Sequence, residues 1–185
     1  MTSWQLRQAV GALRAGGIIA YPTETVYGLG CDPLNHKAIK ALLALKQRPI
    51  EKGLILIGAS LDHLLPFIDI DDADLRQKLK KPTAQPTTWV VPARKYTPTW
   101  LTGKHSTVAV RITPHPIAAK LCNHFGGAIV STSANPAKLP PARTALTVKR
   151  YFHDNLDYLF HAAIEPNNKP SQIRDLLSDK VFRGT

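Results

Sequence analysis

The chain has 185 residues, of which 44% are hydrophobic and 20% are charged. This composition is typical of a folded globular protein and argues against long disordered tracts. No apolar run approaches the ~18 residues of a membrane-spanning helix, and residues 1–7 lack the pattern of a secretory signal. We therefore expect a cytoplasmic protein with no membrane contact. The 24 Lys and Arg residues against 13 Asp and Glu give a net charge of +11. Such an excess favours a nucleotide or nucleic-acid partner, the alternative being a generally basic surface.

Predicted helices and strands alternate along the whole chain. The first helix covers residues 4–15, with Leu6, Val10 and Leu13 on one face. Asn35 is expected to cap a second helix that ends near Leu45, and Ser60 a short third one. Further helices are predicted over 72–79, 116–122 and 144–151, and strands over 18–21, 54–57, 88–91, 107–112, 128–130, 158–160, 172–174 and 181–182. The alternation predicts an α/β fold with a mixed sheet and a single domain over 1–185.

Three polar stretches follow predicted strands or end a predicted helix. Residues 21–28 (YPTETVYG) form a strand that breaks into a hydroxyl-rich turn, or else a plain loop. Residues 46–48 (KQR) place two cations at a helix end, where cations ordinarily complement the helix dipole. Residues 131–135 (STSAN) place hydroxyls and an amide after a buried strand, where ligands gather in open α/β sheets, although an N-cap and turn would look the same. No metal-ligand spacing is recognisable, so the metal ligands of any such site stay unknown.

In this order and spacing, these stretches resemble the YrdC/TsaC family, the threonylcarbamoyl-AMP synthases. The resemblance covers nearly the whole chain, and it is to the short bacterial form of the family. The K-x-R motif stands as Lys46-Gln47-Arg48, the S-x-N motif as Ser133-Ala134-Asn135, and Val108-Ala109-Val110-Arg111 lies between them. The resemblance implies a single-domain, twisted open mixed sheet with flanking helices (YrdC-like) and a concave basic face.

The resemblance also implies a reaction in which L-threonine, bicarbonate and ATP give L-threonylcarbamoyl-AMP and pyrophosphate. A separate tRNA-modification transferase complex would then move the threonylcarbamoyl group to adenosine 37 of tRNAs that read codons beginning with A. Mg²⁺ is expected with ATP, because fixed cations and a metal offset the charge on the phosphates. Direct tRNA or other RNA binding is a further expectation from the positive charge.

The resemblance implies roles for particular residues. Lys46 and Arg48 are expected to be catalytic, both reaching the phosphates or the carbamate, and this requires the helix to end between or just before them. Arg111 is suited to the threonine carboxylate because its planar fork can bond both oxygens. The remaining implied contacts are Thr25, Ser131 and Ser171 with threonine, and Arg48, Lys52, Thr107, Ser133, Asn135 and Arg183 with ATP.

Two other functions fit the same sequence. One is a non-catalytic module that binds tRNA or double-stranded RNA, which the charge of +11 would also serve. The other is an enzyme that transfers a carbamoyl group to a different amine. Release of pyrophosphate that depends on ATP, threonine and bicarbonate together distinguishes the expected synthase from both.

Overall fold

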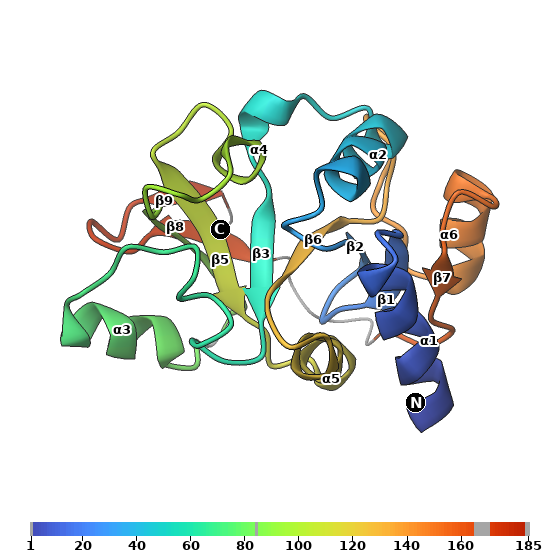
Figure 1. Cartoon of the computed structure of the whole chain (residues 1–185), viewed down its shortest axis with the longest axis horizontal. Helices are drawn as coiled ribbons and strands as arrows, with labels where there is room; N and C mark the ends of the chain where they lie inside the picture. The colour runs from blue at the N-terminus through green and yellow to red at the C-terminus, as the bar shows by residue number, and fades with distance from the viewer. Residues whose placement is uncertain (1, 84, 165–170, 184–185) are drawn as a thin grey trace.

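The computed structural model describes residues 2–83, 85–164 and 171–183, and these form helices around one mixed sheet (Figure 1). The helical segments are α1 (Ser3–Arg14), α2 (His36–Lys46), the 3-10 turn η1 (Ile50–Lys52), α3 (Ala73–Lys80), α4 (Thr99–Thr102), α5 (Pro116–Phe125) and α6 (Ala145–Phe152). The strands are β1 (Ile19–Pro22), β2 (Tyr27–Gly30), β3 (Ile55–Gly58), β4 (Thr87–Pro92), β5 (Thr107–Ile112), β6 (Ile129–Ser133), β7 (Tyr158–Leu159), β8 (Gln172–Asp175) and β9 (Val181–Arg183). The α/β class and the mixed sheet are confirmed.

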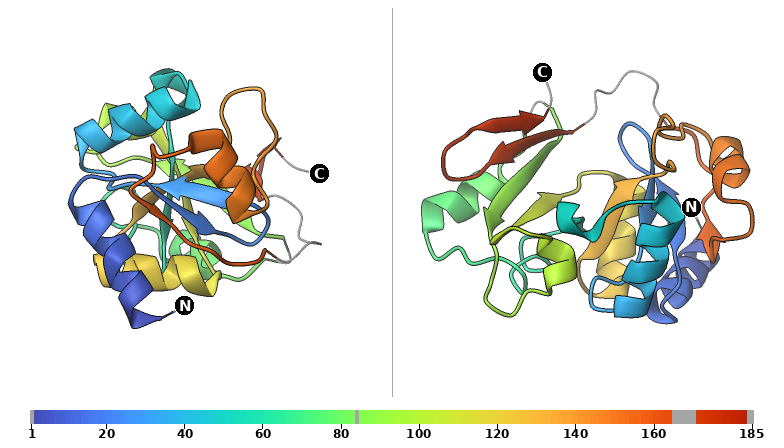
Figure 2. Two further views of the ribbon diagram at one scale, coloured as in Figure 1. Left: turned by 90° about the vertical axis from the view of Figure 1, so that its right-hand side faces the viewer. Right: turned by 90° about the horizontal axis from the view of Figure 1, so that it is seen from above.

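The strands lie in the order β7-β1-β2-β6-β3-β5-β4-β8-β9. Three pairs are parallel (β1 with β7, β3 with β5, β4 with β8), and the other neighbouring strands pair antiparallel. Strand β6 pairs with β2 near its end, at Ser133 and Thr132, and with β3 nearer its start. Seen from above, the β8–β9 hairpin and the β1–β2 hairpin stand at opposite ends of the twisted sheet (Figure 2). Strand β6 therefore joins two halves of the sheet.

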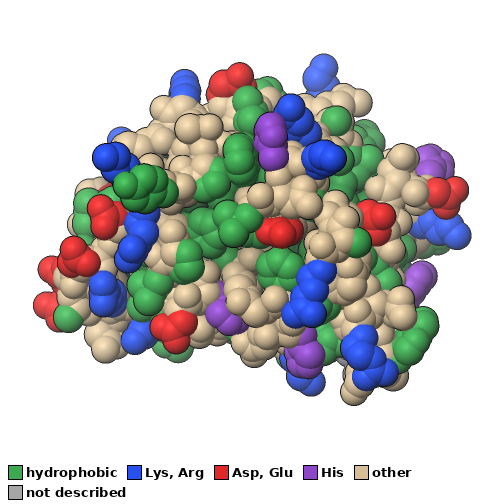
Figure 3. Space-filling model, viewed as in Figure 1, with side chains coloured by type: hydrophobic (Ala, Val, Ile, Leu, Met, Phe, Trp, Pro, Cys, Tyr) green, Lys and Arg blue, Asp and Glu red, His purple; other side chains and the backbone are tan. Residues whose placement is uncertain are grey.

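Apolar residues lie on both faces of strand β1. In β1, Ile19 and Tyr21 pack with α1 and α5, whereas Ala20 packs in the larger cluster that contains α2. Successive side chains of a strand point to opposite faces, so a strand buried on both faces needs a continuous apolar run. The side of the molecule that faces the viewer in Figure 1 carries basic and acidic side chains interspersed with apolar ones (Figure 3). Among the described residues, no helix combines the length and apolar character that crossing a bilayer requires.

Capping residues explain where several helices begin. The Asn35 side chain accepts from the backbone N–H of Ala38 at 3.1 Å, and that of Thr144 from Thr147 at 3.1 Å, as predicted. The short helix predicted after Ser60 is wrong, because residues 62–67 form successive turns. Pro66 lacks an amide donor and disfavours helical geometry in the residue before it, so a helix cannot extend there.

Two segments depart from the prediction near the site. Strand β6 runs to Ser133, three residues beyond the predicted strand, because its polar end pairs with Gly28 and Leu29 of β2. Helix α4 and the turn η1 were not predicted, since three or four residues are too few to show a helical period.

Candidate active site

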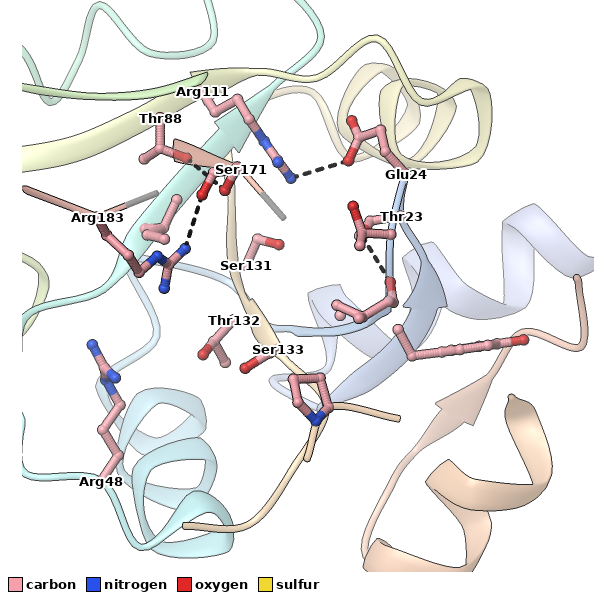
Figure 4. A pocket seen from close by; sticks show the side chains of 16 residues that line it. Thr23, Glu24, Arg48, Thr88, Arg111, Ser131, Thr132, Ser133, Ser171 and Arg183 are labelled. Carbon is pink, nitrogen blue, oxygen red and sulfur yellow. Dashed lines mark hydrogen bonds and ion pairs between the residues drawn. The ribbon is translucent and has the colours of Figure 1, made fainter. Parts of the chain in front are cut away.

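A pocket of about 320 Å³ opens between the two halves of the sheet. It is bounded by the turn between β1 and β2, by the end of β6, by Arg48 after α2, and by residues of β4, β5 and the β8–β9 hairpin. Figure 4 shows the arginines along one side and Thr23 and Glu24 opposite, with Ser131 and Ser133 between them and Ser171 beside Arg183. The lining residues are Thr23, Glu24, Thr25, Val26, Tyr27, Gly28, Arg48, Ile55, Thr88, Arg111, Ser131, Thr132, Ser133, Pro141, Ser171 and Arg183.

The turn between β1 and β2 places hydroxyl groups at one wall. Both the backbone N–H and the side-chain hydroxyl of Thr23 donate to the Val26 carbonyl, at 3.1 Å and 2.7 Å, and close the turn. Thr25, within the turn, is buried and lines the pocket. The turn therefore presents a rigid polar edge to a ligand.

An ion pair crosses the pocket between Glu24 and Arg111. Arg111 Nη2 lies 3.5 Å from Glu24 Oε2, and each side chain is only 10% exposed. Thr113, two residues after Arg111, donates its hydroxyl to Glu24 Oε1 at 3.2 Å. The Nε atoms of Arg48 and Arg111 are buried without a hydrogen-bond partner among the described residues. Buried polar atoms are normally satisfied, so these two donors are suited to a ligand.

The three arginines of the lining lie within one another's electrostatic field. Burial, and then the charge of Arg183, lowers the pKa of Arg48; burial, and then Arg111, lowers that of Arg183. Arg48 Nη2 donates to the Gly53 carbonyl at 3.0 Å, and Arg183 Nη2 to the Ser171 carbonyl at 3.3 Å. Among the described lining residues, Glu24 alone opposes three positive charges, so a polyanion entering the pocket would relieve their repulsion.

Ser131 is held in the pocket from behind by Tyr21. The fully buried phenol of Tyr21 donates to Ser131 Oγ at 2.8 Å. Burial raises the pKa of Tyr21, so its hydroxyl stays protonated and remains a donor. The ring lies against Gly30, where a Cβ atom would come within 2.9 Å of the ring. A glycine is needed at this position because any side chain would push the tyrosine away.

Seven of the eleven predicted site residues line this pocket: Thr25, Arg48, Arg111, Ser131, Ser133, Ser171 and Arg183. Lys46 and Asn135 lie next to it but contact each other instead. Lys52 is an exposed residue of η1, and Thr107 pairs with Pro92 at the start of β5. The structure therefore gathers most, but not all, of the predicted set.

Sequence reasoning missed Glu24 as the partner of Arg111, and it missed Thr88 and Thr132. Glu24 stood in the hydroxyl-rich turn already singled out, but its partner is 87 residues later in the chain. Thr132 was within the STSAN stretch, and it lines the pocket together with its neighbours Ser131 and Ser133. Thr88 had no local signal, because it reaches the pocket through the pairing of β4 with β8, where its hydroxyl lies 3.4 Å from Ser171 Oγ.

The described residues do not fit a metal site. None of their His, Cys, Asp and Glu side chains forms a group of three that could hold an ion. Of the lining residues that the structure describes, the one carboxylate is Glu24, which already faces Arg111. A Mg²⁺ ion in this pocket would need most of its oxygen ligands from water or a phosphate ligand.

A family model described as "Telomere recombination", which covers the Sua5, YciO and YrdC proteins, matches residues 11–183. The chain belongs to the Sua5/YciO/YrdC family. It is 50% identical to a protein of Cellvibrio japonicus named threonylcarbamoyl-AMP synthase, and the match covers 99% of both chains.

Solved structures of this family share the fold. P. abyssi Sua5, in a crystal structure complexed with L-threonine, superposes with a TM-score of 0.87 at 31% identity over 95% of this chain. The match covers 52% of the P. abyssi protein, so this chain spans about half of that longer one. E. coli YciO superposes with a TM-score of 0.83 at 26% identity, over 98% of this chain and 89% of that one. The YrdC-like fold is therefore confirmed.

Proposed function

We propose that this chain is an L-threonylcarbamoyladenylate synthase, an enzyme of the nucleotidyltransferase class. It would combine L-threonine, bicarbonate and ATP into threonylcarbamoyl-AMP, pyrophosphate and water, with residues 1–185 acting as one YrdC-like domain. The observation that carries the proposal is a hydroxyl-lined pocket with three arginines and one glutamate. The name of the Cellvibrio japonicus relative and its near full-length match support it.

The pocket chemistry suits two anions that must react. A threonine carbamate has to attack the α-phosphate of ATP, and both carry negative charge. Arg48 and Arg183 would offset the charge of the phosphates and of departing pyrophosphate, because fixed positive groups stabilise charge that develops in the transition state. Arg111 would hold the threonine carboxylate, and Thr25, Ser131 and Ser171 would supply hydrogen bonds to the rest of the amino acid.

The other proposed contacts involve the rest of the nucleotide, the metal ion and the acceptor of the product. Ser133 faces the same cavity and would bond the nucleotide, whereas Lys52 and Thr107 could meet only a nucleotide that extends past the lining. Mg²⁺ would enter with ATP, as a metal–nucleotide complex. The product would pass to a tRNA-modification transferase complex in the cytoplasm, for transfer to adenosine 37 of tRNA.

Pyrophosphate release tests the proposal directly. The purified chain is incubated with ATP and Mg²⁺, with threonine and bicarbonate supplied together or one at a time. We expect pyrophosphate only when both are present, and serine or other amines in place of threonine should give much less. A chain that binds RNA but releases no pyrophosphate would instead be a binding module. Equal turnover with another amine would make it a carbamoyl-transferring enzyme of different specificity.

A further inference from the structure

The end of α2 sends the two cations of the K-x-R motif in different directions. Lys46 is the last helical residue, and Gln47 adopts a left-handed conformation with φ 51° and ψ 44°. The N–H groups of Gln47 and Arg48 still bond the last turn, at 3.0 Å to Ala44 and 3.0 Å to Leu43. After this reversal Arg48 lines the pocket, whereas Lys46 is 6% exposed and does not.

The Lys46 ammonium is bonded to the S-x-N motif. Its Nζ donates to the backbone carbonyl of Ser133, to the carbonyl of Asn135 at 2.8 Å and to Asn135 Oδ1 at 3.4 Å. An ammonium group has three donors, so these three acceptors use its full capacity. The Lys46 carbonyl also accepts from the N–H of Ala137 at 3.2 Å. A buried charge is tolerated when it is hydrogen-bonded in this way.

Asn135 holds the same segment from its other side. Its Oδ1 accepts from Ser133 Oγ at 2.6 Å, and its Nδ2 donates to the Leu139 carbonyl at 2.6 Å. The loop after Ser133 returns to the sheet, where the N–H of Ala142 donates to the Ala134 carbonyl at 2.9 Å. Two residues that flank this closure, Ser133 and Pro141, line the pocket.

We propose that Lys46 and Asn135 are positioning residues that brace the 133–142 loop and do not touch the bound nucleotide. Each motif then supplies one lining residue, Arg48 or Ser133, and one bracing residue, and the two bracing residues bond each other. This assignment replaces the direct phosphate contact expected for Lys46. It rests on the proposed function only in that the pocket binds a nucleotide.

A nucleotide series separates bracing from phosphate contact. The affinities of AMP, ADP and ATP are measured by calorimetry at one Mg²⁺ concentration for the wild type, Lys46→Met and Arg48→Met. If Lys46 is a brace, Lys46→Met should lower the affinity for all three nucleotides by the same factor, about tenfold, because the brace acts through neutral groups of the loop. A phosphate contact that has been removed should cost more with each added phosphate, from about tenfold for AMP to about a hundredfold for ATP at Arg48. Lys40→Met, an exposed lysine on the same helix, is the matched control and should bind as the wild type does.

A variant of Asn135, the residue that bonds Lys46, tests the proposal independently. Asn135→Ala should show the same uniform loss, and the double variant Lys46→Met/Asn135→Ala should be no weaker than the worse single variant, because both remove one brace. If Lys46→Met does not fold, as judged by its thermal transition, Asn135→Ala decides alone. A loss at Lys46 or Asn135 that grows from AMP to ATP, or no loss at all, overturns the proposal. A wild type without affinity for any nucleotide would refute the proposed function itself, whatever the variants do.

Discussion

At the scale of single residues, Arg111 is the side chain that we expect to bind threonine and not ATP. Its charge is paired with Glu24 at 3.5 Å, and its buried Nε has no partner among the described residues. A single contact at this length leaves most of the guanidinium fork available. A carboxylate can therefore bond Arg111 while Glu24 stays in place.

We expect Arg111→Ala to weaken threonine binding by about a hundredfold, since hydrogen bonds to a charged group are lost. ATP affinity should change by less than about threefold, because Arg48 and Arg183 remain. Calorimetry with each ligand measures the difference, and Arg150→Ala on the exposed face of α6 is the control. The double variant Arg111→Ala/Glu24→Gln also removes the Glu24 charge that the loss of Arg111 leaves unpaired, and its affinity for threonine should remain low. Equal losses for threonine and ATP would contradict the assignment.

Lys46 makes the stability of the protein depend on pH. Burial, and then the charge of Arg48, lowers the pKa of Lys46 from 10.5 to about 8. Between these two values the unfolded chain keeps the proton and the folded chain has lost it. The free energy of unfolding therefore rises with pH in this window.

Lys46→Met cannot titrate, so the wild-type stability minus that of the variant isolates this effect. The difference should be flat below pH 8 and rise between about pH 8 and pH 10.5. Denaturant unfolding at a series of pH values measures it. A difference that stays constant across the window would show that the pKa of Lys46 is the same in the folded and the unfolded chain.

At the scale of secondary-structure elements, the left-handed residue Gln47 determines how the chain leaves α2. Gln47 has a positive φ of 51°, a conformation that costs most residues free energy and glycine little. The same residue decides that Arg48, and not Lys46, reaches the pocket. Its backbone therefore links the end of a helix to the composition of the site.

Gln47→Gly should keep activity and raise the free energy of unfolding by up to about 1 kcal/mol. Gln47→Val should lower that free energy by about 1–2 kcal/mol, because a branched side chain is strained at positive φ. The valine variant should also lose ATP affinity as Arg48 is displaced. Chemical denaturation and calorimetry check both expectations, and full ATP affinity in the valine variant would contradict the link.

Sequence patterns predicted helices and strands well where an apolar repeat extends over several turns and the capping residue lies next to the helix. Helices α1, α2 and α6 and most strands follow from spacing and from caps such as Asn35. The hydroxyls at the end of β6 are typical of a turn and predict a loop there, whereas pairing with β2 makes this segment strand. The site was predicted as a set of motifs. The direction of Lys46 was not, because it depends on the backbone of Gln47 and on a loop about 90 residues away.

The net charge of +11 belongs to the whole molecule. The face drawn in Figure 3 shows both signs of charge, whereas the pocket lining holds three arginines and one glutamate. We expect tRNA to bind mainly through its phosphates. Such binding releases counterions, so it weakens steeply as salt is added.

Filter binding or anisotropy with tRNA at increasing salt tests this expectation. Between 50 and 200 mM salt the affinity should fall by roughly 10³-fold if about six phosphates are contacted. A homopolymer of similar length should compete almost as well, because phosphate contacts carry no sequence information. An affinity that is flat across this range would show that contacts to bases, and not charge, hold the RNA.

The order of the strands has a consequence for how the protein is made. β2 and β3 follow each other along the chain but are not neighbours, because β6 is inserted between them. A nascent chain that has emerged only as far as α5 therefore holds two strands with unfilled edges, and pairings between distant segments form slowly. Ser131, Thr132 and Ser133 reach the pocket only when β6 enters this gap. Ser171, just before β8, and Arg183 of β9 follow β6 in the chain and also line the pocket. The binding site is thus completed late in synthesis, after β6 has joined the two halves of the sheet.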